Sequence, residues 1–358
     1  MEEKLKFFYK NKKILITGAT GFKGSWLCMW LNYLGADIIG IGHSPNKNKN
    51  LFYSLNLQKK IKLNLLDIRN KIKLKKIINK NRPQIIFHMA AQPLIYDSYI
   101  NPSLTYEVNS LGTLNIIDIV KDCKFVKSLV CITSDKCYEN NNSTTGFKEN
   151  DKLGGDDPYS GSKACAEIIA KTYLKSFFFS KNKKMNCGLA TARAGNVIGG
   201  GDWSPNRLIP DAINSILNNK TIFLRNPNFN RPWQHVMEPL YGYLILAEKI
   251  FHNPKKFSGA WNFGTTKNTI TNVFEIVKKI INYWGNGRVR SLTKKMFYEQ
   301  KNLQLNIYKA KKKLKWKPKY TITESVNITS EWYKKVLVER ISPEVITLDQ
   351  IKKYMKKK

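Results

Sequence analysis

Short apolar runs alternate with longer amphipathic stretches through the first half of the chain. The runs are rich in isoleucine, leucine and valine and have the length of buried strands. The stretches between them carry apolar residues at helical spacing, and the first of these ends at a glycine, a typical helix end. This alternation predicts an α/β fold with a doubly wound parallel sheet. Strands are expected at 13–17, 37–41, 61–66, 85–89, 129–132 and 186–193, and helices at 25–35, 103–121 and from Pro158 towards Ser180.

A glycine-rich turn joins the first expected strand to the first expected helix. Gly18, Gly21 and Gly24 have the spacing G-x-x-G-x-x-G, rather than the commoner G-x-G-x-x-G. Glycines let the backbone approach a pyrophosphate, which then lies at the helix N-terminus. A turn without a ligand can have the same spacing, but the strand before it and the helix after it favour dinucleotide binding. The turn therefore predicts a Rossmann-type domain.

The pattern changes after residue 198, where elements become shorter and loops contain more asparagine, proline and arginine. Further helices are expected at 239–250 and 271–284, and residues 259–263 are expected to form a strand that rejoins the first domain. The lysine-rich segments 311–319 and 352–358 are interpreted as solvated faces or a frayed tail. We expect a Rossmann domain over 1–198, rejoined by 233–264, and a smaller, discontinuous C-terminal substrate domain made of 199–232 and 265–358.

The ends of the second and third strands bear on the choice of dinucleotide. An NAD site often places an acid after the second strand, to hold the ribose hydroxyls. Here Gly42, His43 and Ser44 follow that strand, so the acid is missing and the choice between NAD and NADP stays open on this evidence. His43 or Ser44 can hydrogen-bond the ribose, or His43 is an ordinary loop residue. Asp67, after the third strand, can accept a hydrogen bond from the adenine amino group or cap the next helix.

Small residues follow the fourth strand, at the edge where open α/β sheets bind ligands. Ala90 and Ala91, followed by Gln92, suit the passage of backbone past a cofactor. His88 lies inside the strand and is expected to be packed there. Asn109 is polar in the middle of an otherwise apolar-periodic helix, so we expect it to tie neighbouring backbone together.

Groups with proton chemistry are concentrated in two segments. Residues 133–136 leave the fifth strand as a polar group, which is either an ordinary turn or part of a site. Pro158 suits a helix start, so Tyr159 and Lys163 are expected one turn apart on one helix face. An ammonium there favours the phenolate, so we expect the pKa of Tyr159 to fall below its usual value of about 10. Tyr-x-x-x-Lys alone is common, so the rest of the chain must provide the hydride acceptor and the substrate.

Composition narrows the classes of function. No apolar run approaches the length of a membrane span, and residues 1–11 are lysine-rich without an apolar signal core, so a cytoplasmic location is expected. The six cysteines form no Cys-x-x-Cys pair and accompany no histidine cluster, so we expect buried free thiols and no metal. The formal net charge of +35 at pH 7 invites a nucleic-acid interpretation, but the lysines are spread along the chain without a nucleic-acid-binding motif. Neither nucleic acid nor membrane is expected as a partner.

Arginines stand out in the second half of the chain. Arg207, Arg225 and Arg231 occur there, and His235 follows closely. The guanidinium group suits phosphate oxygens, although an isolated arginine is more often a solvated surface group. A basic surface can also attract an anionic small substrate.

These motifs together resemble the extended short-chain dehydrogenases/reductases and, within them, the CDP-glucose 4,6-dehydratases. The resemblance runs from about residue 12 to about residue 320 and is carried by residues 17–26, 133–140, 159–167, 192–203 and 231–235. It implies a hydro-lyase with tightly bound NAD that converts CDP-glucose to CDP-4-dehydro-6-deoxy-glucose. In this family C4 of the sugar is oxidised, water is eliminated across C5 and C6, and the hydride returns to C6.

The resemblance implies a role for each catalytic residue. Tyr159 would take the C4 hydroxyl proton, Lys163 would lower the pKa of Tyr159 and hold the nicotinamide ribose, and Ser134 would hydrogen-bond the C4 oxygen. Asp135 matches the acid that protonates the C6 hydroxyl. Lys136 stands where the wider group of dehydratases has a glutamate base, a departure that the CDP-glucose branch shares. A neutral lysine can act as the C5 base if burial lowers its pKa, and this role is left open.

The resemblance also implies two sets of binding residues. Gly161, which is unusual inside a helix, is interpreted as allowing close approach of the cofactor. The expected NAD-binding residues are Gly18, Thr20, Gly21, Phe22, Lys23, Gly24, His43, Asp67, Ile68, Ala90, Ala91, Gln92, Asn109, Thr133, Tyr159, Lys163 and Arg193. The expected substrate-binding residues are Gln92, Ser134, Asn196, Arg207, Leu208, Arg225, Arg231 and His235.

Two alternatives remain beside this interpretation. One is a dehydratase or epimerase that acts on a GDP-, UDP- or dTDP-linked sugar, and the other is a catalytically silent NAD-binding or nucleic-acid-binding protein. Asp135 argues against a simple epimerase, which needs no acid at C6, and the set of Ser134, Tyr159 and Lys163 argues against silence. The family implies a homo-oligomer, either a dimer or a tetramer, and a role in making deoxysugars of a bacterial surface polysaccharide such as an O-antigen.

Overall fold

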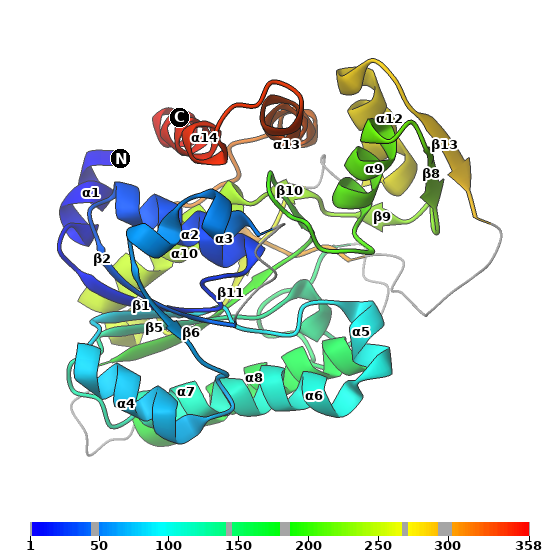
Figure 1. Cartoon of the computed structure of the whole chain (residues 1–358). Coiled ribbons are helices and arrows are strands. Elements are labelled where there is room, and N and C mark those ends of the chain that lie inside the picture. Colours follow the sequence, from blue (N-terminus) through cyan, green and yellow to red (C-terminus); the bar gives the residue numbers. More distant parts are fainter. Residues whose placement is uncertain are drawn as a thin grey trace.

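A seven-stranded parallel sheet forms the centre of the molecule. The computed structural model describes residues 2–43, 50–140, 145–179, 187–266, 271–292 and 303–357, so Ser44, Ser180 and Asn186 lie outside the described residues. The strand order is β11-β6-β5-β4-β1-β2-β3, which reverses direction between β1 and β4 (Figure 1). This topology confirms the predicted doubly wound α/β sheet. The strands are β1 (Lys13–Thr17), β2 (Asp37–Gly42), β3 (Lys62–Leu65), β4 (Ile85–His88), β5 (Ser128–Ile132), β6 (Gly188–Ala194) and β11 (Gly259–Phe263).

Helices cover both faces of the sheet (Figure 1). Ile14 and Ile16 of β1 point to one face, where they belong to the same buried cluster as Trp26, whereas Leu15 points to the other face. Successive strand side chains point in opposite directions, so the central strand contributes to two cores. The first face carries α1 (Glu2–Tyr9), α2 (Phe22–Tyr33), α3 (Leu51–Ser54) and α10 (Met237–His252), and the second carries α4 (Lys71–Asn81), α7 (Gly112–Val120) and α8 (Pro158–Tyr173).

The helix expected at 103–121 is divided into three parts. A π-helical turn, η3 (Glu107–Leu111), lies between α6 (Pro102–Tyr106) and α7, and α5 (Ile95–Ile100) comes before them. Asn109 lies in this turn, and its side chain accepts a hydrogen bond from the Gln92 N–H at 2.8 Å and donates to the Gln92 carbonyl at 3.1 Å. It also donates to the Ser162 hydroxyl at 2.9 Å. The expectation that Asn109 ties neighbouring backbone together is confirmed.

A second group of elements lies partly beyond the carboxyl ends of the strands and partly, with α14, over α2 (Figure 1). In this group β8 pairs with β13 and β9 pairs with β12, while β7 pairs with β10. The C-terminal helix α14 packs against α2 and α3, and α13 packs against α12. The division into two domains stays a prediction. The elements are β7 (Val197–Ile198), α9 (Leu208–Leu217), β8 (Thr221–Leu224), β9 (Asn230–Arg231), β10 (Gln234–His235), β12 (Thr271–Asn272), α12 (Val273–Trp284), β13 (Arg288–Ser291), α13 (Ile322–Leu337) and α14 (Pro343–Lys356).

The lysine-rich segments are amphipathic rather than frayed. Trp316 is fully buried between lysines, and its indole N–H donates to the Glu238 carbonyl at 3.1 Å. In the last helix Tyr354 is fully buried, and its hydroxyl donates to the Glu238 carboxylate at 2.7 Å. Lysines on both sides of these aromatic residues are exposed. The predicted solvated faces are therefore present, and the predicted frayed tail is wrong up to Lys356.

Candidate active site

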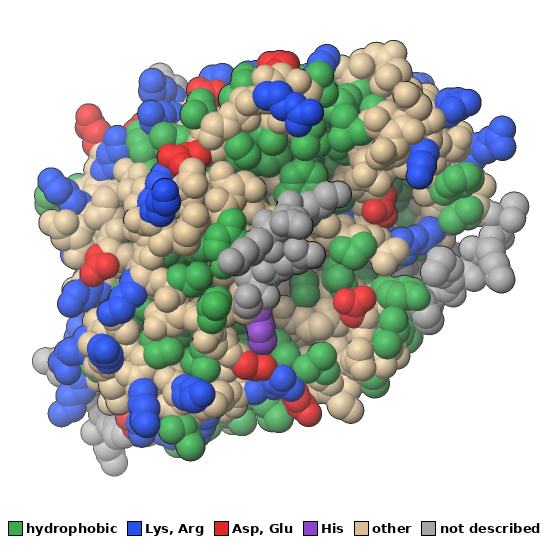
Figure 2. Space-filling model, in the orientation of Figure 1, with side chains coloured by type: hydrophobic (Ala, Val, Ile, Leu, Met, Phe, Trp, Pro, Cys, Tyr) green, Lys and Arg blue, Asp and Glu red, His purple; other side chains and the backbone are tan. Residues whose placement is uncertain are grey.

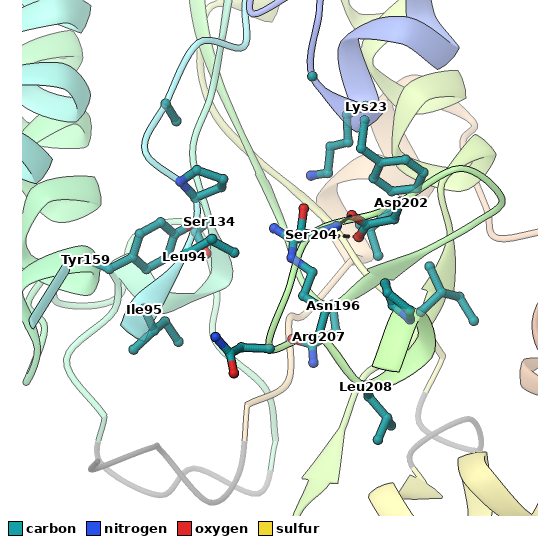
Figure 3. Close-up of a pocket in the computed structure, with 18 of the residues that line it drawn as sticks. Lys23, Leu94, Ile95, Ser134, Tyr159, Asn196, Asp202, Ser204, Arg207 and Leu208 are labelled. Atoms are coloured by element: carbon teal, nitrogen blue, oxygen red, sulfur yellow. Dashed lines mark hydrogen bonds and ion pairs between the residues drawn. The ribbon is translucent and has the colours of Figure 1, made fainter. Parts of the chain in front are cut away.

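A cavity of about 660 Å³ opens at the carboxyl ends of the parallel strands. Its walls come from the glycine turn, from the ends of β4 and β5, from the start of α8 and from the segment between β7 and β9. Tyr159 and Ser134 lie on one side of it, and Lys23, Asp202 and Arg207 lie on the other (Figure 3). The cavity is placed where the strand order reverses, which is the usual ligand position in open α/β sheets.

Three glycines shape the wall between β1 and α2 in two ways. Gly18 has φ +73°, and a Cβ there would lie 2.7 Å from the Ala90 nitrogen. A Cβ on Gly24 would lie 2.0 Å from the Gly18 oxygen. A Cβ on Gly21 would have the same oxygen at 3.4 Å, an ordinary contact. Gly18 and Gly24 are therefore required for packing, whereas Gly21 is exposed at the N-terminus of α2 with no side-chain cap.

The residues after β2 and β3 form the next part of the wall. His43 and Ile68 line the cavity, and Thr20 donates a hydrogen bond to the His43 carbonyl at 3.1 Å. Asp67 does not line it, because its carboxylate accepts hydrogen bonds from Arg69 at 2.7 and 3.0 Å, which lower the pKa of Asp67. The structure thus supports neither expectation for Asp67, since the cap of α4 is Asn70.

The five predicted catalytic residues meet at this cavity, on the turn that follows β5 and on the first turns of α8. Asp157 caps α8, and its carboxylate accepts a hydrogen bond from the Ser160 N–H at 3.0 Å, which fixes the first turn that carries Tyr159. Ser134 caps η4 (Asp135–Cys137), and its hydroxyl accepts from the Lys136 N–H at 3.3 Å. We call residues 134–136 the catalytic turn. Ser134, Asp135, Lys136, Tyr159 and Lys163 all line the cavity.

The titration of Tyr159 differs from the expectation. Burial raises the pKa of Tyr159 to about 12, and the hydrogen bond with Ser134 lowers it by less. Burial also lowers the pKa of Lys163 to about 8, and its ammonium donates to the Ile132 carbonyl at 3.4 Å. The expected fall in the pKa of Tyr159 is therefore wrong for this structure, because desolvation raises this pKa by more than the Ser134 hydrogen bond and the Arg207 charge lower it.

Asp135 points to the cavity that Tyr159 faces. Its side chain is almost fully buried, and within the described part of the chain its Oδ2 has no hydrogen-bond partner. Its Oδ1 accepts from the Ser134 hydroxyl at 3.1 Å and lies 3.7 Å from the Lys136 ammonium. A buried carboxyl oxygen without a partner is costly unless a ligand or a proton satisfies it. This geometry suits a group that gives a proton to a bound molecule.

Cationic and polar residues line the end of the cavity farther from the sheet. Arg207 forms an ion pair with Asp202 at 3.0 Å, and Arg225 donates to the Asn206 side chain at 2.9 Å. Arg231 is buried, and its guanidinium lies 5.3 Å from the ring of Phe229. The predicted substrate-binding residues that line the cavity are Ser134, Asn196, Arg207, Leu208, Arg225 and Arg231.

Most of the predicted NAD-binding residues also line the cavity, and four do not. Asp67, Gln92, Asn109 and Arg193 lie outside its lining. Gln92 donates through its amide to the Leu94 carbonyl and the Thr105 hydroxyl, each at 3.0 Å, so its side chain braces the loop after β4. Those that line it are Gly18, Thr20, Gly21, Phe22, Lys23, Gly24, His43, Ile68, Ala90, Ala91, Thr133, Tyr159 and Lys163.

Three further expectations are corrected by packing. Arg193 is buried in an ion pair with Glu167 at 2.6 Å, away from the cavity. His235 is fully buried beside the ring of Trp26, and burial lowers its pKa to about 3. A Cβ on Gly161 would lie 2.4 Å from the Tyr106 hydroxyl, so this glycine accommodates Tyr106 and not a cofactor.

The cavity contains residues that the sequence analysis did not select. Leu94 and Ile95 lie beside Tyr159 (Figure 3), and Asp202 holds Arg207. Only their positions in the sequence could have indicated them, because Leu94 follows the small residues after β4 and Asp202 follows three consecutive glycines. His88 is packed as expected, between the hydroxyls of Thr17 at 2.7 Å and Thr113 at 3.0 Å.

The described ranges hold no cluster of three or more His, Cys, Asp or Glu side chains with metal-binding geometry. All six cysteines are free thiols, and only Cys165 is partly exposed. In the same ranges, no helix has the length and apolarity needed to cross a membrane. On the face shown in Figure 2, lysine and arginine side chains are spread around the periphery and form no continuous stripe.

Comparisons with known proteins agree with this geometry. The family model described as GDP-mannose 4,6 dehydratase matches residues 15–329. The CDP-glucose 4,6-dehydratase of Salmonella typhimurium is 42% identical over 331 residues, which cover 92% of each protein. The crystal structure of dTDP-glucose 4,6-dehydratase from Bacillus anthracis in complex with NAD superposes with a TM-score of 0.74 at 26% identity, covering 90% of this chain and 97% of that one. A UDP-glucose 4-epimerase from Thermotoga maritima shares the fold, with a TM-score of 0.76, 21% identity, and coverage of 91% and 99%.

Proposed function

The chain belongs to the GDP-mannose 4,6-dehydratase family, and from this membership we propose that it is an NAD-dependent CDP-glucose 4,6-dehydratase. Its product would be CDP-4-dehydro-6-deoxy-glucose. The observation that carries the proposal is the meeting of Ser134, Asp135, Lys136, Tyr159 and Lys163 at one cavity with the glycine turn. The choice of CDP-glucose as the substrate rests on the similarity to the Salmonella CDP-glucose 4,6-dehydratase, which extends over nearly the whole of both chains.

The glycine turn fits a dinucleotide. Among the described residues, no side chain caps the N-terminus of α2 at Gly21, and the first N–H groups of a helix favour a phosphate anion there. The small wall residues Ala90 and Ala91 leave room beside the sheet, and Lys163 lines the same cavity. NAD bound here would take a hydride from C4 of the sugar and return it to C6.

The chain's own residues would move the protons. Tyr159 would accept the proton of the C4 hydroxyl, assisted by the Ser134 hydroxyl that bonds to it. Because burial opposes both the phenolate and the Lys163 ammonium, the two charges would stabilise each other once a proton leaves. Asp135 would protonate the departing C6 hydroxyl through its unpartnered Oδ2. Lys136 stands beside it and is our candidate for the C5 base.

The outer part of the cavity would hold the CDP group. Arg207, Arg225 and Arg231 line it, and guanidinium groups bind phosphate oxygens in pairs of hydrogen bonds. Asp202 holds Arg207 in place at 3.0 Å, which reduces the ordering that substrate binding requires.

A single assay compares this proposal with its alternatives. The protein is incubated with CDP-glucose and separately with GDP-, UDP- and dTDP-linked sugars, and alkali then reveals the 4-keto product by its ultraviolet absorbance. We expect absorbance with CDP-glucose alone. Absorbance with another nucleotide sugar would reassign the substrate, an epimerised sugar without the 4-keto product would indicate an epimerase, and no reaction with any of them would contradict the proposal.

We also propose that the enzyme is a homo-oligomer, a dimer at least. Exposed apolar side chains on α5, α6, η3 and α8, which pack against one another, support a contact between copies. Ile168→Lys is expected to give monomers in light scattering, while Ile72→Lys on α4, where Ile72 is 72% exposed, serves as the matched control. A wild-type monomer would contradict this. The residues are Ile100, Leu104, Leu111 and Ile168, which are 58%, 39%, 51% and 51% exposed.

The setting proposed for the enzyme is the cytoplasm, in the synthesis of deoxysugars for a bacterial surface polysaccharide. Free, mostly buried thiols are compatible with a reducing compartment. Fractionation of the source cells, with activity measured in each fraction, would test the location.

A further inference from the structure

A buried ion pair lies next to the catalytic turn but outside the cavity lining. Arg193 of β6 and Glu167 of α8 are 3% and 2% exposed, and Nη2 of the guanidinium lies 2.6 Å from Oε2 of the carboxylate. Removing two charges from water is unfavourable unless their other hydrogen-bonding positions are also filled. The groups that fill them show what the pair holds.

The pair holds both ends of the segment that contains the catalytic turn. At its start, the Thr133 hydroxyl donates a hydrogen bond to the Glu167 carboxylate. At its end, the Tyr138 hydroxyl accepts from Arg193 Nη1 at 2.6 Å, and the guanidinium carbon lies 4.7 Å from the centre of the Tyr138 ring. The Tyr138 hydroxyl also donates to the Asn262 side chain at 2.8 Å, on β11. The six residues from Thr133 to Tyr138 thus run from one member of the ion pair to the other.

The helix that carries Tyr159 takes part in the same network. Glu167 follows Lys163 by one helical turn on α8, and both are buried. Lys163 donates to the Ile132 carbonyl at 3.4 Å, directly before the point where Thr133 bonds to Glu167. The catalytic turn and the start of α8 are therefore fixed relative to each other through Glu167, which does not line the cavity.

We propose that Glu167 and Arg193 are positioning residues, which hold the catalytic turn against Tyr159 so that the proton donor and proton acceptor reach the same substrate. This inference rests on the proposed function, and it replaces the cofactor role expected for Arg193. A displacement of about 1 Å at a reacting group can cost on the order of 100-fold in rate, so a loosened turn should lower turnover without changing affinity.

Two isosteric substitutions test the proposal. Tyr138→Phe removes the hydroxyl that joins the turn to Arg193 and keeps the ring stacked on Phe147, 4.9 Å away. Thr191→Val is the matched control, because Thr191 of β6 donates to Glu167 at 2.7 Å but belongs neither to the turn nor to the cavity. We expect Tyr138→Phe to lower kcat by about 10- to 100-fold while KM for CDP-glucose stays within about twofold. Thr191→Val should keep the wild-type kcat, with a similar loss of Tm in both variants.

The outcomes separate positioning from stability and from the proposed function. Equal kcat values in Tyr138→Phe and wild type, or equal losses in both variants, would overturn the proposal, as would a loss confined to KM. If Tyr138→Phe does not fold, Thr133→Val removes the hydrogen bond at the other end of the segment, and the same loss of kcat is expected from it. Because Thr133 also lines the cavity, its NAD affinity is measured to show that the loss does not come from weaker cofactor binding. A wild-type protein inactive on every nucleotide sugar would refute the proposed function instead. Arg193→Lys keeps the positive charge but cannot bind Tyr138 and Glu167 through two separate guanidinium nitrogens, so its kcat should fall as in Tyr138→Phe.

Discussion

Two glycines of the same turn have different roles, and alanine substitutions separate them. A Cβ on Gly24 would lie 2.0 Å from the Gly18 oxygen and 2.9 Å from the Ala19 Cα, so the turn would have to move. Gly24→Ala is therefore expected to lower the free energy of unfolding by about 1–3 kcal/mol, the usual cost of overpacking. A Cβ on Gly21 meets its nearest neighbour at 3.4 Å, and the backbone there is extended, with φ −81° and ψ 171°. Gly21→Ala should therefore stay within about 1 kcal/mol of the wild-type stability.

Cofactor affinity should respond in the opposite order. The methyl group of Gly21→Ala would stand at the N-terminus of α2, where the backbone approaches a pyrophosphate, so Kd for NAD should rise about tenfold or more, which is about 1.4 kcal/mol. Urea unfolding followed by tryptophan fluorescence measures stability, and calorimetric titration with NAD measures affinity. Wild-type NAD affinity in Gly21→Ala would refute the assignment of this turn to the cofactor. Wild-type stability in Gly24→Ala would refute the packing argument.

Three further predictions concern the acid, the nucleotide end and the core. Asp135→Asn keeps the side-chain shape but removes the proton donor, so kcat should fall about 100-fold or more at constant KM, and an unchanged kcat would exclude the role. Arg225→Ala should raise KM for CDP-glucose more than it lowers kcat, and an unchanged KM would remove Arg225 from the substrate site. Burial lowers the pKa of His88 from 6.5 to about 3, so between these values the unfolded chain binds a proton that the folded protein does not. The free energy of unfolding should therefore be independent of His88 above pH 6.5 and should fall as the pH falls towards 3, by up to about 1.4 kcal/mol per pH unit. His88→Gln should show a shallower dependence of urea midpoint on pH over this window, and an equal slope would contradict the argument.

The sheet could be predicted because its signal is local. The first and last strands have the predicted bounds, since each is a short apolar run and needs only its own residues to be recognised. The helix at 103–121 could not be predicted in detail. Its π turn places the Asn109 amide against Gln92, a partner 17 positions away, and helical periodicity does not report such a contact.

The sequence predicts the site residues that follow directly after a parallel strand, but it does not predict residues whose role depends on the direction of the side chain. Ser134 and Asp135 follow a parallel strand, so they reach the ligand edge of the sheet whatever the packing. Arg193 lies near the end of the neighbouring strand β6, and the direction of its side chain depends on Glu167 of α8. The pKa of Tyr159 shows the same limit, because the spacing to a lysine is visible in the sequence and the extent of burial is not.

The net charge of the chain is a poor guide to this site, because a few buried cations contribute more to the affinity for an anion than many solvated cations do. Lys23 and Lys163 line the cavity, and the pKa of each is lowered to about 8, mainly by burial and, for Lys23, also by the Arg207 charge. A charge held in such a place is unfavourable until an anion joins it, so a diphosphate would stabilise both ammonium groups. Surface lysines act in water and are screened beyond about 8 Å at physiological ionic strength. Affinity for an anionic substrate should therefore arise from the few charges at this cavity and not from the surplus spread over the surface.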